Sequence, residues 1–160
     1  MKRTPITLLA LLAVASISTL VVWAGNGHFI NSFTTAACTS SSSLEVKFKE
    51  AGLESGSVET IVLNGQGTAT YQCFNKGGHN PAAGNKETVG GPVVASGEFS
   101  AAKNGNIIGT LTLSPPGPGD FSCPSGQALV GPTDVSFTDV SISDLDSGAT
   151  AAVTAAVSCP

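Results

Sequence analysis

The feature that most constrains this fold is a series of short segments in which apolar and polar residues alternate. Between residues 44 and 49, Leu, Val and Phe alternate with Glu and Lys, and residues 151–159 repeat the pattern with Ala, Val and Cys on one face. A period of two is typical of a β-strand that has one face on a core and the other in solvent. The many β-branched residues, and the glycines and prolines between segments, also favour strands. The sequence therefore predicts an all-β fold.

Eight segments are candidate strands, which predicts an antiparallel β-sandwich of seven or eight strands with an immunoglobulin-like general architecture. The segments are residues 44–49, 58–63, 67–74, 93–102, 107–113, 128–130, 135–142 and 151–159. Two Asn-Gly pairs, Asn64-Gly65 and Asn104-Gly105, predict tight hairpin turns with positive φ at the central residues. A change of apolar phase within residues 135–142 predicts a β-bulge near Thr138.

Residues 1–24 have the pattern of a secretory signal peptide. Lys2 and Arg3 precede an apolar run from Ile6 to Trp23, and the small residue Ala24 follows it. The 19 residues from 6 to 24 are also about long enough to cross a bilayer as an uncleaved anchor, which is the alternative. We expect cleavage after Ala24 and a secreted, extracellular protein that contacts a membrane only if the leader is retained.

Cleavage would leave 160 − 24 = 136 residues, the size of a single domain. We expect a polar N-terminal arm at residues 25–43, which begins as a flexible stalk, and a β-sandwich domain at residues 44–160. Five lysines and no arginine face eleven acidic residues after the leader, a net charge of 5 − 11 = −6. Because nucleic-acid binding needs a basic surface, this composition argues against a nucleic-acid partner.

Four cysteines follow the leader, namely Cys38, Cys73, Cys123 and Cys159. In an oxidising compartment they predict two disulfides and no free thiol. Four cysteines allow three pairings. Chain entropy gives about 4 kcal/mol for a loop between residues 73 and 123 and about 5 kcal/mol for one between residues 38 and 159, and the other pairings are similar. Loop length therefore leaves the pairing open.

Residues 67–73 resemble the F strand of an immunoglobulin domain, in which a tyrosine lies two residues before a cysteine. The likeness is local, because the chain after the leader has no tryptophan and the motif falls early in the domain. We interpret it as convergent strand chemistry and expect Tyr71 and Cys73 to point inward.

A longer resemblance covers about residues 44–148. The segments ATYQCFNKGGHNPAAGNK (69–86), ASGEFSAAKNGN (95–106), LTLSPPGP (111–118) and FSCPSGQ (121–127) resemble those of an uncharacterised group of small secreted bacterial proteins. The resemblance implies secretion from a bacterium and a compact β domain, and it implies no activity. It also favours pairing Cys73 with Cys123, because both lie in the shared segments, and Cys38 with Cys159 would then clamp the ends of the domain.

Residues 74–91 form the longest segment of the domain without a regular alternation of apolar and polar residues, and they are the candidate binding loop. Glycines at 77, 78 and 84 would let its backbone approach a ligand closely. Its polar side chains are Asn75, Lys76, His79, Asn80, Asn85 and Lys86. The alternative is a solvated loop that only joins two strands. The proline-rich residues 114–120 are expected to be a rigid connector, and the alternative is a presented binding loop braced by Cys123.

Catalytic and metal-binding patterns are weak. His28 and His79 are the only histidines and lie far apart in the sequence, and no Gly-x-Ser-x-Gly elbow is present. Residues 144–148, Asp-Leu-Asp-Ser-Gly, look like the start of a calcium loop but lack a third ligand and the closing glutamate. We therefore expect no metal, no cofactor and no enzymatic activity.

These observations predict a secreted, non-enzymatic extracellular structural or binding module, with an extracellular protein or a cell-surface component as its partner. One alternative is a secreted hydrolase with an unrecognised acidic active site. Another is a self-assembling surface fibre in which the N-terminal arm adds to a neighbour's sheet. A carbohydrate-binding module is disfavoured, because Tyr71 is the only Trp or Tyr left for stacking on a sugar and is expected to be buried.

Overall fold

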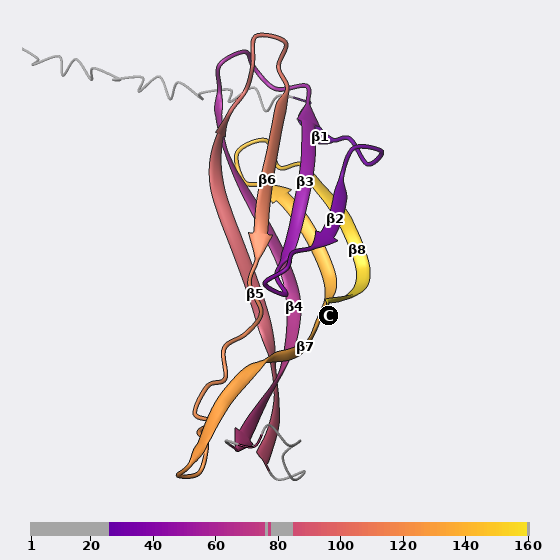
Figure 1. Ribbon diagram of the computed structural model, residues 1–160. Helices are drawn as coiled ribbons and strands as arrows, with labels where there is room; N and C mark the ends of the chain where they lie inside the picture. Colours follow the sequence, from indigo (N-terminus) through magenta and orange to yellow (C-terminus); the bar gives the residue numbers. More distant parts are fainter. Residues whose placement is uncertain (1–25, 76, 78–84, 160) are drawn as a thin grey trace, which may run out of the picture.

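The protein is an all-β sandwich of two four-stranded antiparallel sheets (Figure 1). The computed structural model describes residues 26–75, 77 and 85–159, so the leader and Lys76, His79 and Asn80 of the candidate loop lie outside the described residues. Its strands are β1 (His28–Phe29), β2 (Thr35–Cys38), β3 (Leu44–Ala51), β4 (Val58–Asn75), β5 (Lys86–Ser100), β6 (Ile107–Leu113), β7 (Gln127–Asp144) and β8 (Thr150–Cys159). Within the described ranges no helix is long and apolar enough to span a membrane.

The first sheet is built around β3. Strand β6 pairs along one edge of β3 from Ile107 to Leu113, and β1 and β2 pair with β3 on the other edge. The expectation of a flexible stalk is therefore wrong for residues 28–38. The free edge of β3 needs hydrogen-bond partners, and the buried ring of Phe29 gives the arm an apolar anchor.

The second sheet has the order β5-β4-β7-β8 and faces the first across the core. Inward positions alternate along β3, β4 and β7, as the period of two predicts. The ring of Phe48 lies at the centre of an aromatic cluster, edge-on to Phe29 at 6.0 Å and to Phe99 at 5.1 Å between ring centroids. The largest fully buried apolar side chains are Phe48, Phe137, Leu44, Ile61, Leu63, Ile107, Leu113 and Ile142.

The predicted hairpin turn at Asn64-Gly65 is wrong, because β4 runs straight through it. Asn64 pairs with Val94 of β5 and with Ser141 of β7, so both of its edges are occupied. Gly65 is needed for packing rather than turning: a Cβ there would lie 3.2 Å from Val140 Cγ2. Pairing on two sides fixed an extended strand where the local turn signal favoured a reversal.

The turn at Asn104-Gly105 is present, but it joins the two sheets and does not close a hairpin of paired strands. The Gly105 amide donates to Ala102 O at 2.9 Å, and Gly105 has φ of 69°. Asn104 has no positive φ, contrary to the expectation for both central residues. The strands on either side belong to different sheets, since β5 pairs with β4 and β6 pairs with β3.

The predicted bulge near Thr138 is confirmed. Between Asn64 and Gln66 of β4, the register on β7 moves from Ser141 to Thr138, which inserts one extra residue into β7. Asp139 has φ of 53° at this point. The segments 128–130 and 135–142, which were predicted as two strands, form the single strand β7. A second irregularity in its pairing falls opposite Thr70 and Gln72, between these two segments.

Strands β4, β5 and β7 run past the ends of β3 and β6 as a three-stranded extension (Figure 1), which we call the distal ribbon: residues 67–75, 86–92 and 127–134. The first six residues of β5 thus replace part of the expected loop. The non-strand connector 114–126 lies against the inner face of the ribbon, where Tyr71 Oη donates to Pro116 O at 2.8 Å. Tyr71 and Cys73 are buried, as expected.

The two disulfides join Cys38 to Cys159 and Cys73 to Cys123, the pairing that the sequence resemblance favoured. No cysteine in the described chain is free. The first bond ties β2 of one sheet to β8 of the other. The second fixes the connector to the ribbon, so the sandwich and the ribbon each carry one crosslink.

Candidate functional site

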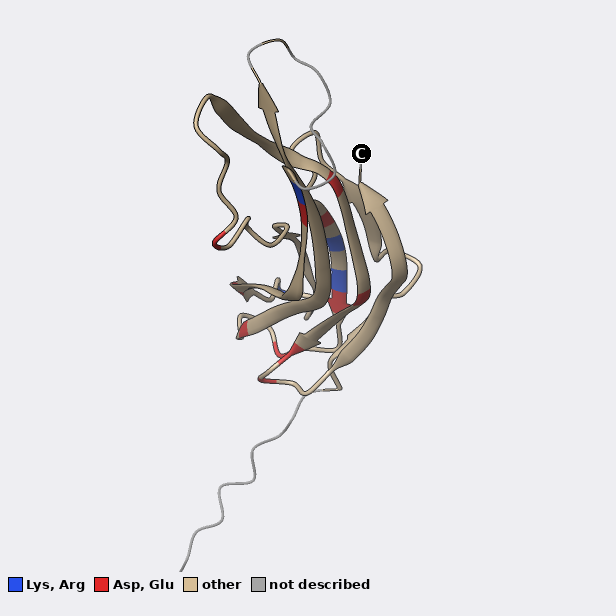
Figure 2. Ribbon diagram, turned by 90° about the horizontal axis from the view of Figure 1, so that it is seen from below, with Lys and Arg blue, Asp and Glu red and all other residues tan. Residues whose placement is uncertain are grey.

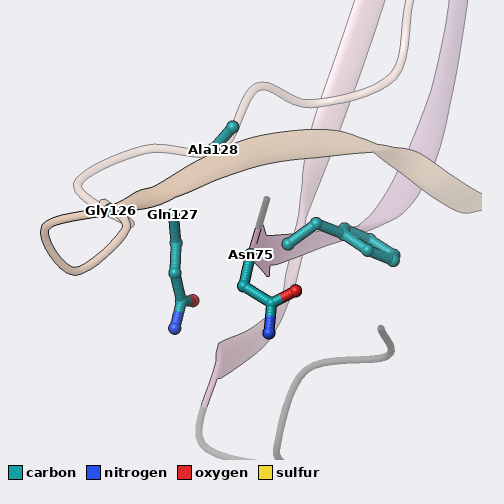
Figure 3. A pocket seen from close by; sticks show the side chains of 5 residues that line it. Asn75, Gly126, Gln127 and Ala128 are labelled. Carbon is teal, nitrogen blue, oxygen red and sulfur yellow. The ribbon is translucent and has the colours of Figure 1, made fainter. Parts of the chain in front are cut away.

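Two regions of the molecule are candidate functional sites, and the first is the tip of the distal ribbon. Phe74, Asn75, Gly126, Gln127 and Ala128 line an open cavity of about 290 Å³ there. The side chains of Asn75 and Gln127 extend side by side from the ends of β4 and β7 (Figure 3). The described lining has no charged residue and is mostly apolar around two amide side chains, so it would suit an uncharged ligand with both apolar and polar groups, such as a peptide.

The structure places half of the predicted loop residues. Asn75 Oδ1 accepts a hydrogen bond from Gly77 N at 3.1 Å, and Asn85 Nδ2 donates to Gln127 Oε1 at 3.0 Å. Lys86 is exposed at the start of β5, paired with Gln72. Gln127 was missed by the sequence analysis, because it lies 127 − 75 = 52 residues after Asn75 and meets it only through strand pairing.

The second region is a cluster of four carboxylates at the opposite end of the sandwich, which we call the acidic end: Glu50, Glu59, Asp144 and Asp146. Glu50 is the last inward position of β3, after Val46 and Phe48. Glu59 is the first inward position of β4, and Asp144 is the last of β7. Three strands from both sheets therefore direct an acidic side chain into the same enclosed space.

Burial at the acidic end is nearly complete. The exposed fraction is 0% for Glu50, 1% for Asp144 and 6% for Glu59, whereas Asp146 is exposed. Carboxylate oxygens of Glu59, Asp144 and Asp146 all lie within 4.8 Å of one another. Buried ionised carboxylates are costly unless they are paired or coordinate a cation, so this arrangement requires a compensating interaction.

The turn between β7 and β8 satisfies part of this requirement. Ser147 Oγ donates to Glu50 Oε1 at 3.0 Å, and Asp146 N donates to Asp144 Oδ1 at 2.9 Å. Thr60 N donates to Asp146 Oδ2 at 2.7 Å, which ties the turn to β4. The remaining buried oxygens, Glu50 Oε2 and Asp144 Oδ2, have no hydrogen-bond partner in the described structure.

The negative charge of the acidic end is not balanced by an ion pair among the described residues. The pKa of Glu50 is raised from 4.5 to about 7, chiefly by burial and also by the neighbouring carboxylate of Asp144, against the opposing hydrogen bond from Ser147. Within the described residues the ion pair found is Lys47 with Glu45, on an outward-facing part of β3. Figure 2 shows acidic positions at several strand ends and few basic positions.

Sequence reasoning missed the acidic end, although a usable signal was present. The expected strand at residues 44–49 stopped one residue before Glu50, and the acids of the 144–148 turn were treated alone. Extending the period of two places residues 50, 59 and 144 on inward faces. Which strand ends meet is a property of the topology. The expectation of no metal site stays a prediction.

His28, the one described histidine, pairs with Ala51 next to Glu50, but it is exposed and does not belong to the group of clustered carboxylates. Its Nδ1 is 2.9 Å from the carbonyl oxygen of Asn26.

Comparison with protein-family models, with curated proteins and with solved structures finds no significant match to this chain. The functional argument therefore depends on the geometry of these two regions.

Proposed function

We propose that the protein is a secreted, non-enzymatic extracellular binding module that engages its partner with the tip of the distal ribbon. The observation that carries the proposal is the open cavity between Asn75 and Gln127, on strands that project beyond the sandwich. The two disulfides and the signal-peptide pattern support an oxidising, extracellular location.

A fixed scaffold supports binding at this tip. The Cys73–Cys123 bond and the hydrogen bond from Tyr71 to Pro116 hold the connector against the ribbon only a few residues from the cavity. Rigid positioning lowers the entropy lost when a partner is bound. Leu129 and Val130, which are 43% and 42% exposed, follow the cavity-lining residue Ala128 on β7 and offer apolar contact area next to the polar amides.

The two alternatives have less support. A hydrolase would need its acids to reach a substrate, and Glu50 and Asp144 are almost fully enclosed, which favours a role within the fold for these groups. A fibre built by donating the N-terminal arm would require β1 and β2 to leave β3 of their own chain. The Cys38–Cys159 bond opposes that exchange.

Binding of the labelled mature protein to cell envelopes of the producing bacterium, and to proteins of its culture medium, tests the proposal. Asn75→Ala combined with Gln127→Ala should weaken binding roughly tenfold or more, because two central polar contacts are lost. The matched control is Thr68→Ala with Ser136→Ala, which removes a 2.6 Å hydroxyl pair from the same two strands away from the cavity. Equal binding by both double variants would contradict the proposal.

A further inference from the structure

We propose that the acidic end binds one calcium ion, with Glu59, Asp144 and Asp146 as ligands and Glu50 as the buried carboxylate behind them. This site is separate from the ribbon tip and does not depend on the proposed function. It lies between the two sheets, where β3, β4 and the β7–β8 turn meet.

The first support is the pair of buried oxygens without a partner. Glu50 Oε2 and Asp144 Oδ2 belong to side chains that are 0% and 1% exposed, and neither accepts a hydrogen bond from the described chain. A buried acceptor that is left unsatisfied destabilises the fold, and a charged one does so more strongly. A bound cation would satisfy Asp144 Oδ2 directly and would balance the charge of Glu50 behind it.

The second support is the spacing of the oxygens. Two ligands on opposite sides of a calcium ion are about 4.8 Å apart, since each Ca–O bond is about 2.4 Å. The oxygens of Glu59, Asp144 and Asp146 lie within 4.8 Å of one another and can share such an ion. Asp146 is exposed, which gives the ion a route from solvent.

The third support is the way the backbone closes around the cluster. A Cβ on Gly27 would lie 2.6 Å from Ser147 Oγ and 2.8 Å from Glu50 Oε1, so the chain approaches these groups as closely as glycine permits. Hydrogen bonds from Thr60 N and Asp146 N direct one oxygen of each aspartate and leave the other available. The cluster has four carboxylates and offers only oxygen atoms as ligands, which is the ligand chemistry that a hard cation prefers.

The competing explanation is a proton shared between Glu50 and Asp144, which would satisfy both oxygens without metal. The two explanations differ in what they predict for added calcium. A proton-sharing pair gains nothing from calcium, whereas a calcium site is stabilised by it in proportion to the logarithm of the concentration.

The experiment is a thermal melt of the mature protein, first in EDTA and then with calcium chloride added up to about 10 mM, a range set by the weak sites of extracellular modules. We expect the melting temperature to rise by roughly 5 °C. Calorimetric titration with calcium chloride should show one ion per chain. No shift in melting temperature and no binding heat would overturn the proposal, and an equal shift with magnesium would overturn the assignment to calcium.

Two variants make the test specific. Asp146→Asn changes an exposed ligand, so the fold should persist in EDTA while the shift with calcium falls at least twofold. Glu59→Gln should reduce the shift at least as much. The matched controls, Asp134→Asn and Glu87→Gln, remove the same charges from exposed positions on the ribbon and should keep the full shift. A full shift in Asp146→Asn and Glu59→Gln would place the calcium elsewhere and contradict the site.

Discussion

The acidic end and the distal ribbon use the same two strands, β4 and β7, in opposite ways. At the acidic end their inward positions face the other sheet and carry carboxylates, which are enclosed by backbone and the β7–β8 turn. In the ribbon the inward positions of β4, among them Ala69, Tyr71 and Cys73, are covered by the proline-rich connector, whereas no residue of β7 between 127 and 134 is buried. The covering layer therefore decides which inward positions are buried and which chemistry they can carry.

The two ends also differ in how they are held together. The sandwich has two sheets and an aromatic cluster of Phe29, Phe48 and Phe99. The ribbon has one layer and depends on a disulfide and on Tyr71 for its cover. We expect the ribbon to open locally before the sandwich unfolds, because fewer apolar contacts must be broken.

The largest expected effect comes from removing each disulfide. Replacing Cys38 and Cys159 by alanine should lower the free energy of unfolding by about 5 kcal/mol, and replacing Cys73 and Cys123 by about 4 kcal/mol, since the bonds close loops of 121 and 50 residues. Hydrogen exchange should show loss of protection confined to the ribbon in the second variant. If both variants lost protection equally in the ribbon and in the sandwich, the two parts would not unfold separately.

The next effect is the dependence of stability on pH in the absence of divalent cations. The pKa of Glu50 is about 7 in the folded protein against 4.5 as the ordinary value. Between these values the folded state holds a proton that the unfolded state has lost. The stabilisation is complete below pH 4.5 and is lost as the pH rises through 7, by on the order of 3 kcal/mol.

Urea unfolding in EDTA near pH 5 and near pH 7.5 measures this change. The Glu50→Gln variant should lack that part of the pH dependence, because an amide does not titrate in this range. Glu87→Gln, an exposed change on the ribbon, serves as its control. The assignment to Glu50 is wrong if Glu50→Gln keeps the full dependence of the wild type.

Two glycines, one in the sandwich and one in the ribbon, allow the packing of these two parts to be compared. A Cβ on Gly109 of β6 would lie 2.5 Å from Phe48 Cζ and 2.6 Å from Phe99 Cε1, whereas a Cβ on Gly91 of the ribbon meets nothing within 4 Å. Gly109→Ala should cost about 2 kcal/mol through overpacking, and Gly91→Ala should change stability by less than about 0.5 kcal/mol. Equal thermal shifts for the two variants would contradict the packing described for the sandwich.

The smallest expected effect is the loss of one hydrogen bond in the ribbon. Tyr71→Phe removes the bond to Pro116 O and should lower the free energy of unfolding by about 1 kcal/mol. Denaturant melts measure it, with proteolysis of the connector as a second readout. A connector that is cleaved no faster in the variant would show that the disulfide alone keeps it in place.

The sequence by itself determined the strands whose one-face burial is strict. Residues 107–113 were predicted at their observed bounds, and the bulge near Thr138 followed from a change of apolar phase within β7. These features are local, because a period of two indicates which face of a single strand is buried. The cysteine pairing was favoured by a resemblance between segments and not by any energy difference.

Tertiary structure decided the features that depend on which strands meet. Asn64-Gly65 favours a turn locally, yet pairing with both β5 and β7 keeps it extended, since each edge would otherwise leave backbone groups unpaired. The arm became part of a sheet for the same reason. Glu50, Glu59 and Asp144 are far apart in the chain, and only the packing of two sheets brought their carboxylates into one buried space.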